Sequence, residues 1–381
     1  MESVEFTEAQ KLLWIFSSIS IGKNIRLSIF GESHGKCIGG VADGFPYGMN
    51  IDLEKLKKFM KRRAPGNNNF VTERVEEDQI KFLSGIRDNT IMGDPLSLII
   101  ENKNANSTEY KEMNGIPRLS HVDFSAIKKY GEYIQLEGGG HFSGRLTAVI
   151  TAFGGIAKQL LETNNIHVLA HLYRIRNILD TEHNLEEDMI NKYKASEKNR
   201  YSVINEENIE IIDQIISELK QKGDSTGGVV ECSVFGLDAG IGEPIFDGIE
   251  NNISKMIFAI PGIKGIEFGS GFDGAVKLGS ENNDEFYIDE NKQIKTRTNH
   301  SGGILGGISN GMPITFKVAF KPTPSIKKEQ NTVDLYKNEE TKIKINGRHD
   351  PCIAIRGVPV VEAVTAIVIL DYLVEKYSVR T

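Results

Sequence analysis

The chain has few cysteines, no surplus of positive charge and no long apolar run, and each absence excludes a class of protein. Its net charge of −7 argues against a general nucleic-acid binder, because such proteins neutralise phosphates with a basic surplus. Three widely spaced cysteines, Cys37, Cys232 and Cys352, indicate neither a disulfide scaffold nor a metal site, so a reducing cytoplasm is expected. No uninterrupted apolar run of about 18 residues is present, so no membrane contact is expected.

The remaining composition is that of a soluble globular protein. The chain has 381 residues, of which 39% are hydrophobic and 25% charged, enough for one large or two ordinary domains. Residues 1–18 contain the apolar stretch 12–16, but acidic residues precede it and no small-residue cleavage site stands out. We therefore interpret residues 1–18 as an amphipathic N-terminal extension rather than a signal peptide.

The pentapeptide Gly31-Glu32-Ser33-His34-Gly35 follows an alternating run, 24–30, that predicts a strand. It places Ser33 and His34 between two glycines at the end of that strand, where a side chain can reach a cleft. The alternative is a turn histidine that bonds to nearby backbone, and the pentapeptide alone does not decide between the two.

Arginines and a histidine flank the predicted helices of the first half. Arg63 ends a helix capped by Asp52, where a cation is also favoured by the helix dipole alone. Arg118 and His121 precede a short helix that Asp123 is predicted to cap, and a helix N-terminus beside such residues is an anion site. A solvated loop histidine is the alternative.

Gly138-Gly139-Gly140 precedes a long helical pattern over residues 146–160, with Ser143 as its candidate cap. Arg145 would lie in the first turn of this helix, where a cation opposes the dipole unless an anion binds there. Gly154 and Gly155 should allow close packing.

The second half contains a glycine-rich run, 301–311, followed by a period-2 strand over 314–320. A dinucleotide fingerprint needs a strand before the glycines and a helix after them, so this run is either a ligand-approaching loop or a glycine hairpin. Lys321-Pro322-Thr323-Pro324-Ser325 then forms a rigid turn with an ammonium and two hydroxyls. Gly347-Arg348-His349-Asp350-Pro351-Cys352 leads to an apolar helix over 359–377, with Pro359 in its first turn.

The order of these motifs resembles the chorismate synthase family. The matching segments are GESHG at 31–35, RRxPG at 62–66, RxxHxD at 118–123, GGGxxSxR at 138–145, GGILGGISNG at 302–311, KPT at 321–323 and GRHDPC at 347–352. The match starts near Ile19 and continues to the C-terminal helix, which makes 19–381 one catalytic domain.

The resemblance implies an α+β fold with antiparallel β-sheets sandwiched between helices, assembled as a homotetramer. It implies a 1,4-anti elimination of phosphate from 5-enolpyruvylshikimate 3-phosphate, which gives chorismate on the route to aromatic amino acids. Reduced FMN is required without net consumption. No added reductase domain is visible, so we expect an external flavin reductant.

The resemblance also implies residue roles. His121 should stabilise or protonate the leaving phosphate, His34 should stand near the flavin pyrimidine edge, and Asp350 should remove a proton through flavin N5. The expected substrate-binding residues are Ser33, Arg63, Arg118, Arg145 and Arg348, and the expected FMN-binding residues are Ser143, Gly306, Lys321, Thr323, Ser325 and Arg348. A substrate with two carboxylates and a phosphate independently calls for several converging arginines.

The chain departs from the family pattern at three positions. Many members have arginine and serine at the positions of His141 and Phe142, and arginine at that of Asn69. His141 can keep part of a donor role, whereas Asn69 removes a charge.

Two other functions would explain part of the sequence. A nicotinamide-dependent oxidoreductase would explain the glycine runs but lacks the strand–GxGxxG–helix unit. A polyanion-binding module would explain the arginine clusters alone. Neither accounts for two histidines, an Arg-x-Asp turn and four glycine-rich segments together.

Overall fold

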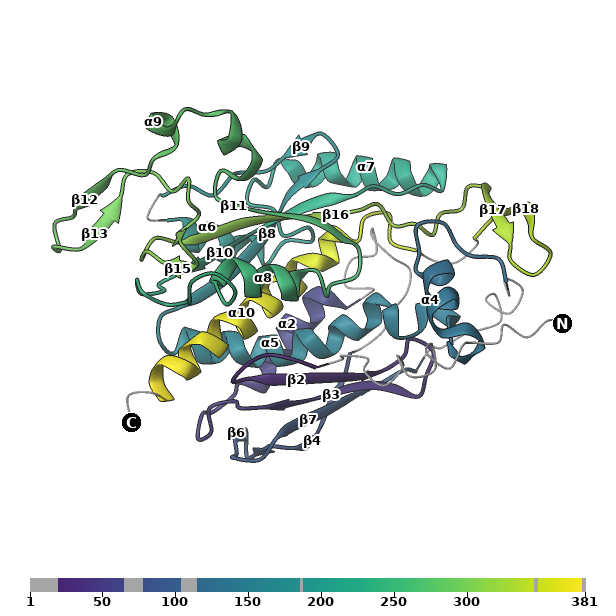
Figure 1. Ribbon diagram of the computed structural model, residues 1–381, viewed down its shortest axis with the longest axis horizontal. Helices are drawn as coiled ribbons and strands as arrows, with labels where there is room; N and C mark the ends of the chain where they lie inside the picture. The colour runs from purple at the N-terminus through teal and green to yellow at the C-terminus, as the bar shows by residue number, and fades with distance from the viewer. Residues whose placement is uncertain (1–19, 65–77, 104–114, 186–187, 346–348, 379–381) are drawn as a thin grey trace.

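A computed structural model describes residues 20–64, 78–103, 115–185, 188–345 and 349–378 (Figure 1). The predicted N-terminal extension, Asn69, Gly347 and Arg348 lie outside these residues.

Two five-stranded sheets form the framework, and every strand pairing among the described residues is antiparallel. The first sheet has the order β1-β2-β3-β7-β4, with strands Ser20–Ile21, Arg26–Gly31, Cys37–Asp43, Leu96–Glu101 and Ile80–Ser84. The second has the order β11-β16-β10-β8-β9, with strands Ile263–Phe268, Ile314–Phe320, Gly228–Phe235, His167–Ile175 and Ile178–Leu179. Sheets paired only in this way do not form a doubly wound dinucleotide fold.

Three helices lie between the two sheets (Figure 1): α2 (Leu53–Arg63), α5 (Thr147–Glu162) and α10 (Ala354–Ser378). Helix α5 contacts β3 and β7 of the first sheet, while α10 contacts β8 and β10 of the second. Because α5 and α10 are covered on all sides, most of their described side chains are buried, and apolar residues predominate around the whole circumference of each helix. The predicted α+β class with antiparallel sheets and helices is confirmed.

Close packing in this helical layer depends on the two glycines of α5. A Cβ atom at Gly154 would lie 2.3 Å from the Cβ of Ala363 on α10, and one at Gly155 would lie 2.6 Å from Leu56 of α2. No Cβ atom tolerates such distances, so the predicted role of these glycines is confirmed.

Shorter elements surround this framework. Its remaining helices are α4 (Asp123–Tyr130), α6 (Met189–Ser196), α7 (Asn208–Lys222), α8 (Ile249–Ile257) and α9 (Gly279–Asn282). The hairpins are β5–β6 (Ile86–Arg87, Thr90–Ile91), β12–β13 (Phe286–Ile288, Ile294–Thr296), β14–β15 (Ile304–Leu305, Ile308–Ser309) and β17–β18 (Gln330–Asp334, Glu339–Ile343). Helix α6 contacts β8 of the second sheet.

Helix α10 is the one described helix that is long and apolar enough to cross a membrane. Within its most apolar window, 89% of the residues are buried inside the structure, as expected for a central core helix.

Two details of the sequence-based helix assignment are wrong. Helix α10 begins at Ala354, so Pro359 lies inside the helix instead of in its first turn. Val122 is the N-cap residue of α4, and the carboxylate of Asp123 is not the cap because it bonds to Arg118 and His121.

Candidate active site

The site is built around a glycine turn, Gly138-Gly139-Gly140, in the 3-10 segment Glu137–Phe142. All three glycines have positive φ, which side-chain-bearing residues rarely adopt. A Cβ atom at Gly138 would lie 2.0 Å from Nδ1 and Cε1 of His34, so the imidazole packs directly on the turn. A Cβ atom at Gly139 would lie 3.2 Å from Cε1 of His121. Neighbouring glycines therefore bring together two histidines that are 87 positions apart in the sequence.

The loop after β2 is held to the same turn. The backbone N–H of Ser33 donates to the carbonyl of Gly140 at 3.1 Å, and the Ser33 hydroxyl faces Gly138. Asn102, at the end of β7, donates its amide to the carbonyls of Glu32 and Gly35 at 3.0 and 2.9 Å. These bonds fix the loop at both ends of the histidine.

His121 is oriented by a buried carboxylate. Its Nδ1 lies 2.9 Å from Oδ1 of Asp123, and Arg118 donates Nε and Nη2 to the two oxygens of the same carboxylate at 2.7 Å each. Burial alone would raise the pKa of Asp123, but the hydrogen bonds from Arg118 and His121 hold it well below its usual range. Nη2 of Arg118 also lies 3.2 Å from Nδ1 of His121, so both partners engage this ring nitrogen and Nε2 points away from the pair.

Arg63 and Arg145 share one carboxylate, that of Asp78, whose side chain is 1% exposed. Arg63 donates Nη1 to Oδ2 of Asp78 at 2.5 Å, and Arg145 pairs with Oδ1. Burial would raise the pKa of Asp78, and the two guanidinium groups lower it instead. Arg145 lies in the 3-10 turn Gly144–Leu146, just before α5 instead of in its predicted first turn, and its charge is paired with the carboxylate of Asp78.

Each of these arginines is also fixed by neutral oxygen atoms. Arg63 donates Nε to Thr147 at 3.2 Å and Nη2 to the carbonyl of Gly144 at 3.0 Å, and Arg145 donates Nε to Asn102 at 3.0 Å. Together with the bond to Asp78, these contacts use three of the five N–H donors of Arg63, and the other two have no partner within the described ranges. The arrangement therefore leaves donors for a ligand.

The 321–325 turn and Asp350 adjoin this cluster. Lys321 donates its ammonium to the carbonyl of Ser120, next to His121. The hydroxyl of Thr323 donates to the carbonyl of Asp350 at 2.7 Å, and the carboxylate of Asp350 pairs with Arg356 at 2.5 Å. Ser325 is buried, and Ser143 lies beside Gly139 and accepts a bond from the N–H of Arg145 at 3.3 Å.

Gly306 is the predicted residue that lies apart. It occupies the turn of the β14–β15 hairpin, whose Gly307 packs on Gly248, and a Cβ atom at Gly306 would meet nothing within 4 Å. Figure 1 places β15 at the opposite end of the molecule from α4. The glycine-rich run therefore contains a hairpin.

The His141–Phe142 departure forms an aromatic cluster beside the glycine turn. The ring centroids of His141 and Phe142 are 4.0 Å apart, and Tyr130 lies within 6.3 Å of both. Burial lowers the pKa of His141, with Lys129 adding to this and Glu32 opposing it.

Sequence reasoning missed three residues that organise the site: Asp78, Asn102 and Arg356. Asp78 follows Glu76 and Glu77, and nothing in the sequence separates the buried carboxylate from its neighbours. Asn102 and Arg356 lie in no recognised motif. The sequence offered one indication of such residues: three arginines predicted to lie in one site require carboxylates nearby to balance their charge.

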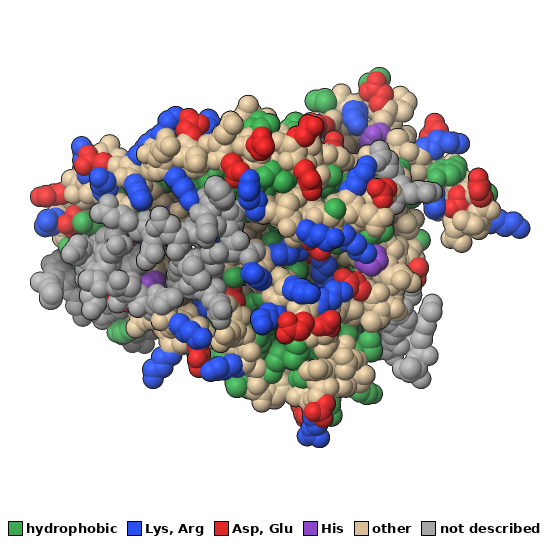
Figure 2. Space-filling view, turned by 180° about the vertical axis from the view of Figure 1, so that it is seen from behind, with side chains coloured by type: hydrophobic (Ala, Val, Ile, Leu, Met, Phe, Trp, Pro, Cys, Tyr) green, Lys and Arg blue, Asp and Glu red, His purple; other side chains and the backbone are tan. Residues whose placement is uncertain are grey.

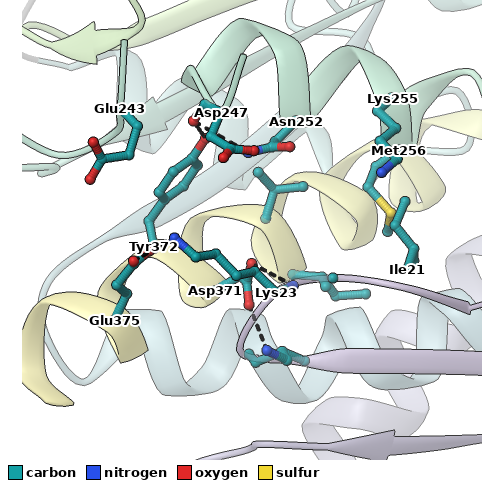
Figure 3. Close-up of a pocket in the computed structure, with 14 residues that line it drawn as sticks. Ile21, Lys23, Glu243, Asp247, Asn252, Lys255, Met256, Asp371, Tyr372 and Glu375 are labelled. Atoms are coloured by element: carbon teal, nitrogen blue, oxygen red, sulfur yellow. Dashed lines mark hydrogen bonds and ion pairs between the residues drawn. The ribbon is translucent and has the colours of Figure 1, made fainter. Parts of the chain in front are cut away.

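A second hollow lies away from this cluster. A pocket of about 380 Å³ between α8, the last turns of α10 and the 21–25 segment contains none of the predicted residues (Figure 3). Two of its charged side chains are already engaged, since Lys23 pairs with Glu375 and Asp371 accepts the backbone N–H groups of residues 23–25. The predicted residues therefore define the candidate active site.

On the face shown in Figure 2, Lys and Arg side chains gather near the centre, with a few acidic side chains among them. The cations that the predicted site requires are instead buried, with Arg63, Arg118 and Arg145 each at most 7% exposed.

Fold and site together define an α+β protein with a buried cationic site that carries two histidines. Comparison with known proteins identifies the family. The family model described as chorismate synthase matches residues 25–374. The chain belongs to the chorismate synthase family, a family of lyases.

Individual relatives agree with this assignment. A chorismate synthase of Methanobrevibacter smithii is 41% identical over 355 residues, which cover 93% of this chain and 96% of that one. One of Prochlorococcus marinus is 42% identical, with 94% and 97% covered. A crystal structure of chorismate synthase has a TM-score of 0.74 at 27% identity and covers 93% of each chain.

Proposed function

We propose that this protein converts 5-enolpyruvylshikimate 3-phosphate to chorismate by 1,4-anti elimination of phosphate, with reduced FMN as cofactor, in aromatic amino acid biosynthesis. The observation that carries this proposal is the packing of His34 and His121 on consecutive glycines, beside buried arginines. Family membership supplies the reaction, and this geometry supplies groups suited to it.

The substrate carries a phosphate and two carboxylates, and the cluster has a surplus of positive charge to receive them. Its five cations, Arg63, Arg118, Arg145, Lys321 and Arg356, face three carboxylates, Asp78, Asp123 and Asp350. Each additional cation within about 4 Å of a ligand anion contributes up to roughly 4 kcal/mol at an effective dielectric near 20, before desolvation. We propose Ser33, Arg63, Arg118, Arg145 and Arg348 as the substrate-binding residues.

His121 is proposed as the group that assists phosphate departure. Asp123 holds its Nδ1, so a proton delivered to a phosphate oxygen would come from Nε2, and Asp123 would stabilise the protonated ring. General acid catalysis of this kind contributes on the order of 10² to 10⁴ in rate. His34, on the adjoining glycine, is proposed to balance charge at the edge of the cofactor.

The residues present fit reduced FMN. The ammonium of Lys321 beside the hydroxyl-bearing 321–325 turn suits a phosphate tail, and the glycine turn allows close approach of a flat ring. When bound, reduced FMN supplies transient electron donation to the allylic system. The proposed holding residues are Ser143, Gly306, Lys321, Thr323, Ser325 and Arg348.

Asp350 is proposed to take up the proton that the substrate ring loses. Within the described residues, Arg356 pairs with the carboxylate of Asp350. The hydroxyl of Thr323 donates to the backbone carbonyl of Asp350 and so fixes the point from which the Asp350 side chain extends.

An anaerobic assay with chemically reduced FMN tests the proposal. Chorismate and phosphate are measured for wild type, for His34→Ala, His121→Ala and Asp350→Ala, and for His167→Ala as a control histidine on β8 outside the cluster. We expect turnover in wild type and control and a loss of at least about 100-fold in the three site variants. Full turnover by the three variants would refute the residue roles, and no chorismate from folded wild type would refute the function.

Dependence on an external reductant is tested in the same assay. We expect turnover with dithionite-reduced FMN and none with oxidised FMN and NADPH alone. Aerobic NADPH consumption in the presence of FMN would show an intrinsic reductase. The site and the family support an enzyme located in the cytoplasm, and such reductants are available there.

We also propose a homotetramer. The segment 271–296, with η5 (Gly271–Val276), α9 and the β12–β13 hairpin, projects from the body (Figure 1). Six of its large apolar side chains are at least 63% exposed: Phe272, Val276, Leu278, Phe286, Ile288 and Ile294. An apolar hairpin of this kind needs a partner surface, and a partner copy would also explain a cofactor role for the remote Gly306. Sedimentation should give four times the chain mass of 42.3 kDa, and a monomer at micromolar concentration would contradict it.

A further inference from the structure

Arg356 joins two parts of the candidate site that come from different elements. It lies in the first turn of α10, and its Nη1 is 2.5 Å from Oδ2 of Asp350. Its Nε donates to the backbone carbonyl of Arg63 at 2.9 Å. One planar guanidinium thus holds the carboxylate of Asp350 and the backbone from which Arg63 extends.

Helix stability does not explain a cation at this position. Near a helix N-terminus a positive charge opposes the macrodipole, at a cost of about 0.3–1 kcal/mol. The carbonyl that Arg356 contacts belongs to the last residue of α2 and has no partner inside its own helix. Arg356 therefore contributes to the geometry where the two helices meet.

The same position brings like charges together. Burial lowers the pKa of Arg63 to about 10, with Asp78 opposing this shift and Arg356 and Arg145 adding to it. Arg63 remains protonated at neutral pH, so three guanidinium groups crowd beside two carboxylates. Pairing with Asp350 offsets part of this repulsion.

We propose that Arg356 is a positioning residue, which keeps the proton-accepting carboxylate of Asp350 in a fixed relation to the substrate-binding guanidinium of Arg63. The inference rests on the proposed function. A lysine cannot replace it, because a single ammonium cannot reach both partners with the fixed fork of a guanidinium. A misplacement of about 1 Å at reacting groups can cost on the order of 100-fold in rate.

Hydrogen exchange on the protein without ligands tests the positioning directly. The variants are Arg356→Met and Arg356→Lys, and Arg200→Met is the matched control. Arg200 also pairs with a carboxylate, that of Asp213, at 36% exposure against 25% for Arg356, and it lies outside the site. In Arg356→Met we expect at least fivefold faster exchange at residues 61–64 and 349–353, and no change there in the control.

Kinetics then separate positioning from general destabilisation. Arg356→Met should lower kcat by 10- to 100-fold and Arg356→Lys by less, with Arg200→Met within twofold of wild type. In an Asp350→Asn background the same Arg356→Met change should cost less than threefold, because the residue through which it acts is already altered.

The outcomes discriminate between the proposals. Unchanged exchange at both segments, or a kcat within twofold of wild type in both Arg356 variants, would overturn the positioning role. An equal effect of Arg356→Met with and without Asp350 would overturn it as well. If Arg356→Met does not fold, Arg356→Lys carries the same comparison. Absence of chorismate in wild type would refute the proposed function, while the exchange measurement would still decide the role of Arg356.

Discussion

Replacement of Asp78 by asparagine tests how the site holds its positive charge. The carboxylate pairs with both Arg63 and Arg145, and the three side chains are between 1% and 6% exposed. Removal of one partner from a buried ion pair typically costs 3–5 kcal/mol, because the remaining charge stays buried without compensation. We therefore expect Asp78→Asn to lower the free energy of unfolding by about 3–5 kcal/mol at pH 7.

The pH dependence of that loss has a definite sign. The pKa of Asp78 in the folded protein is lowered by the two arginines, so the unfolded chain binds a proton more readily than the folded one. Its contribution is present above the unfolded pKa of about 4 and is lost as the pH falls through the folded pKa. The difference between wild type and Asp78→Asn should therefore shrink in acid.

Urea unfolding at fixed protein concentration, followed by circular dichroism between pH 3 and 8, measures both effects. Glu329→Gln is the matched control, because Glu329 pairs with Lys342 while both side chains are about 60% exposed. Solvent screens that surface pair, so Glu329→Gln should leave the urea midpoint nearly unchanged. A loss below about 1 kcal/mol in Asp78→Asn at pH 7, or a loss that does not change with pH, would refute the reasoning.

Three further predictions concern other parts of the molecule. Gly154→Ala adds a Cβ atom 2.4 Å from the Cα of Ala363 on α10. Although alanine has the better helix propensity, this contact should lower the free energy of unfolding, measured in urea, by about 1–3 kcal/mol. Gly93→Ala is the control and should be neutral, because open space surrounds Gly93. Burial lowers the pKa of His171 to about 3, so the unfolded chain takes up a proton at this residue below about 6.5, and the contribution of His171 to stability should fall by about 2 kcal/mol between pH 7.5 and 5. His171→Phe should flatten this dependence in urea titrations, and an unchanged slope would contradict it. Gly138→Ala would place a methyl group 2.0 Å from the ring of His34, so chorismate formation should drop at least tenfold, and the thermal midpoint should also fall because residue 138 has a positive φ. Wild-type turnover would contradict the packing.

Local periodicity predicted the regular elements well. The strand at β2, the helices α2 and α5 and the strand β16 follow from patterns that repeat every two or every 3.6 residues. The start of α10 was predicted too late because proline is favoured in a first helical turn. Pro359 instead lies inside the helix, where tertiary packing holds the helix together.

The site was predictable where a motif combined glycines with reactive side chains. Ser33, His34, His121 and Ser143 come together as the motif order suggested, since the positive φ of the glycine turn lets the loops approach. The counter-ions were not predictable. A carboxylate such as Asp78 acquires its importance only from burial between two arginines that are distant in the sequence, and local pattern carries no information about that.

Placement of the site cations at the ends of central helices has a consequence for how the protein can vary. Arg145 lies two residues before Thr147, where α5 begins, and Gly154 lies seven residues further into that helix, about 10 Å along its axis. Because a packed helix shifts as a rigid rod, a volume change deep in the core moves that guanidinium as well. Natural or engineered variation far inside the hydrophobic layer is therefore a route to retuning ligand affinity while every residue in the site stays the same.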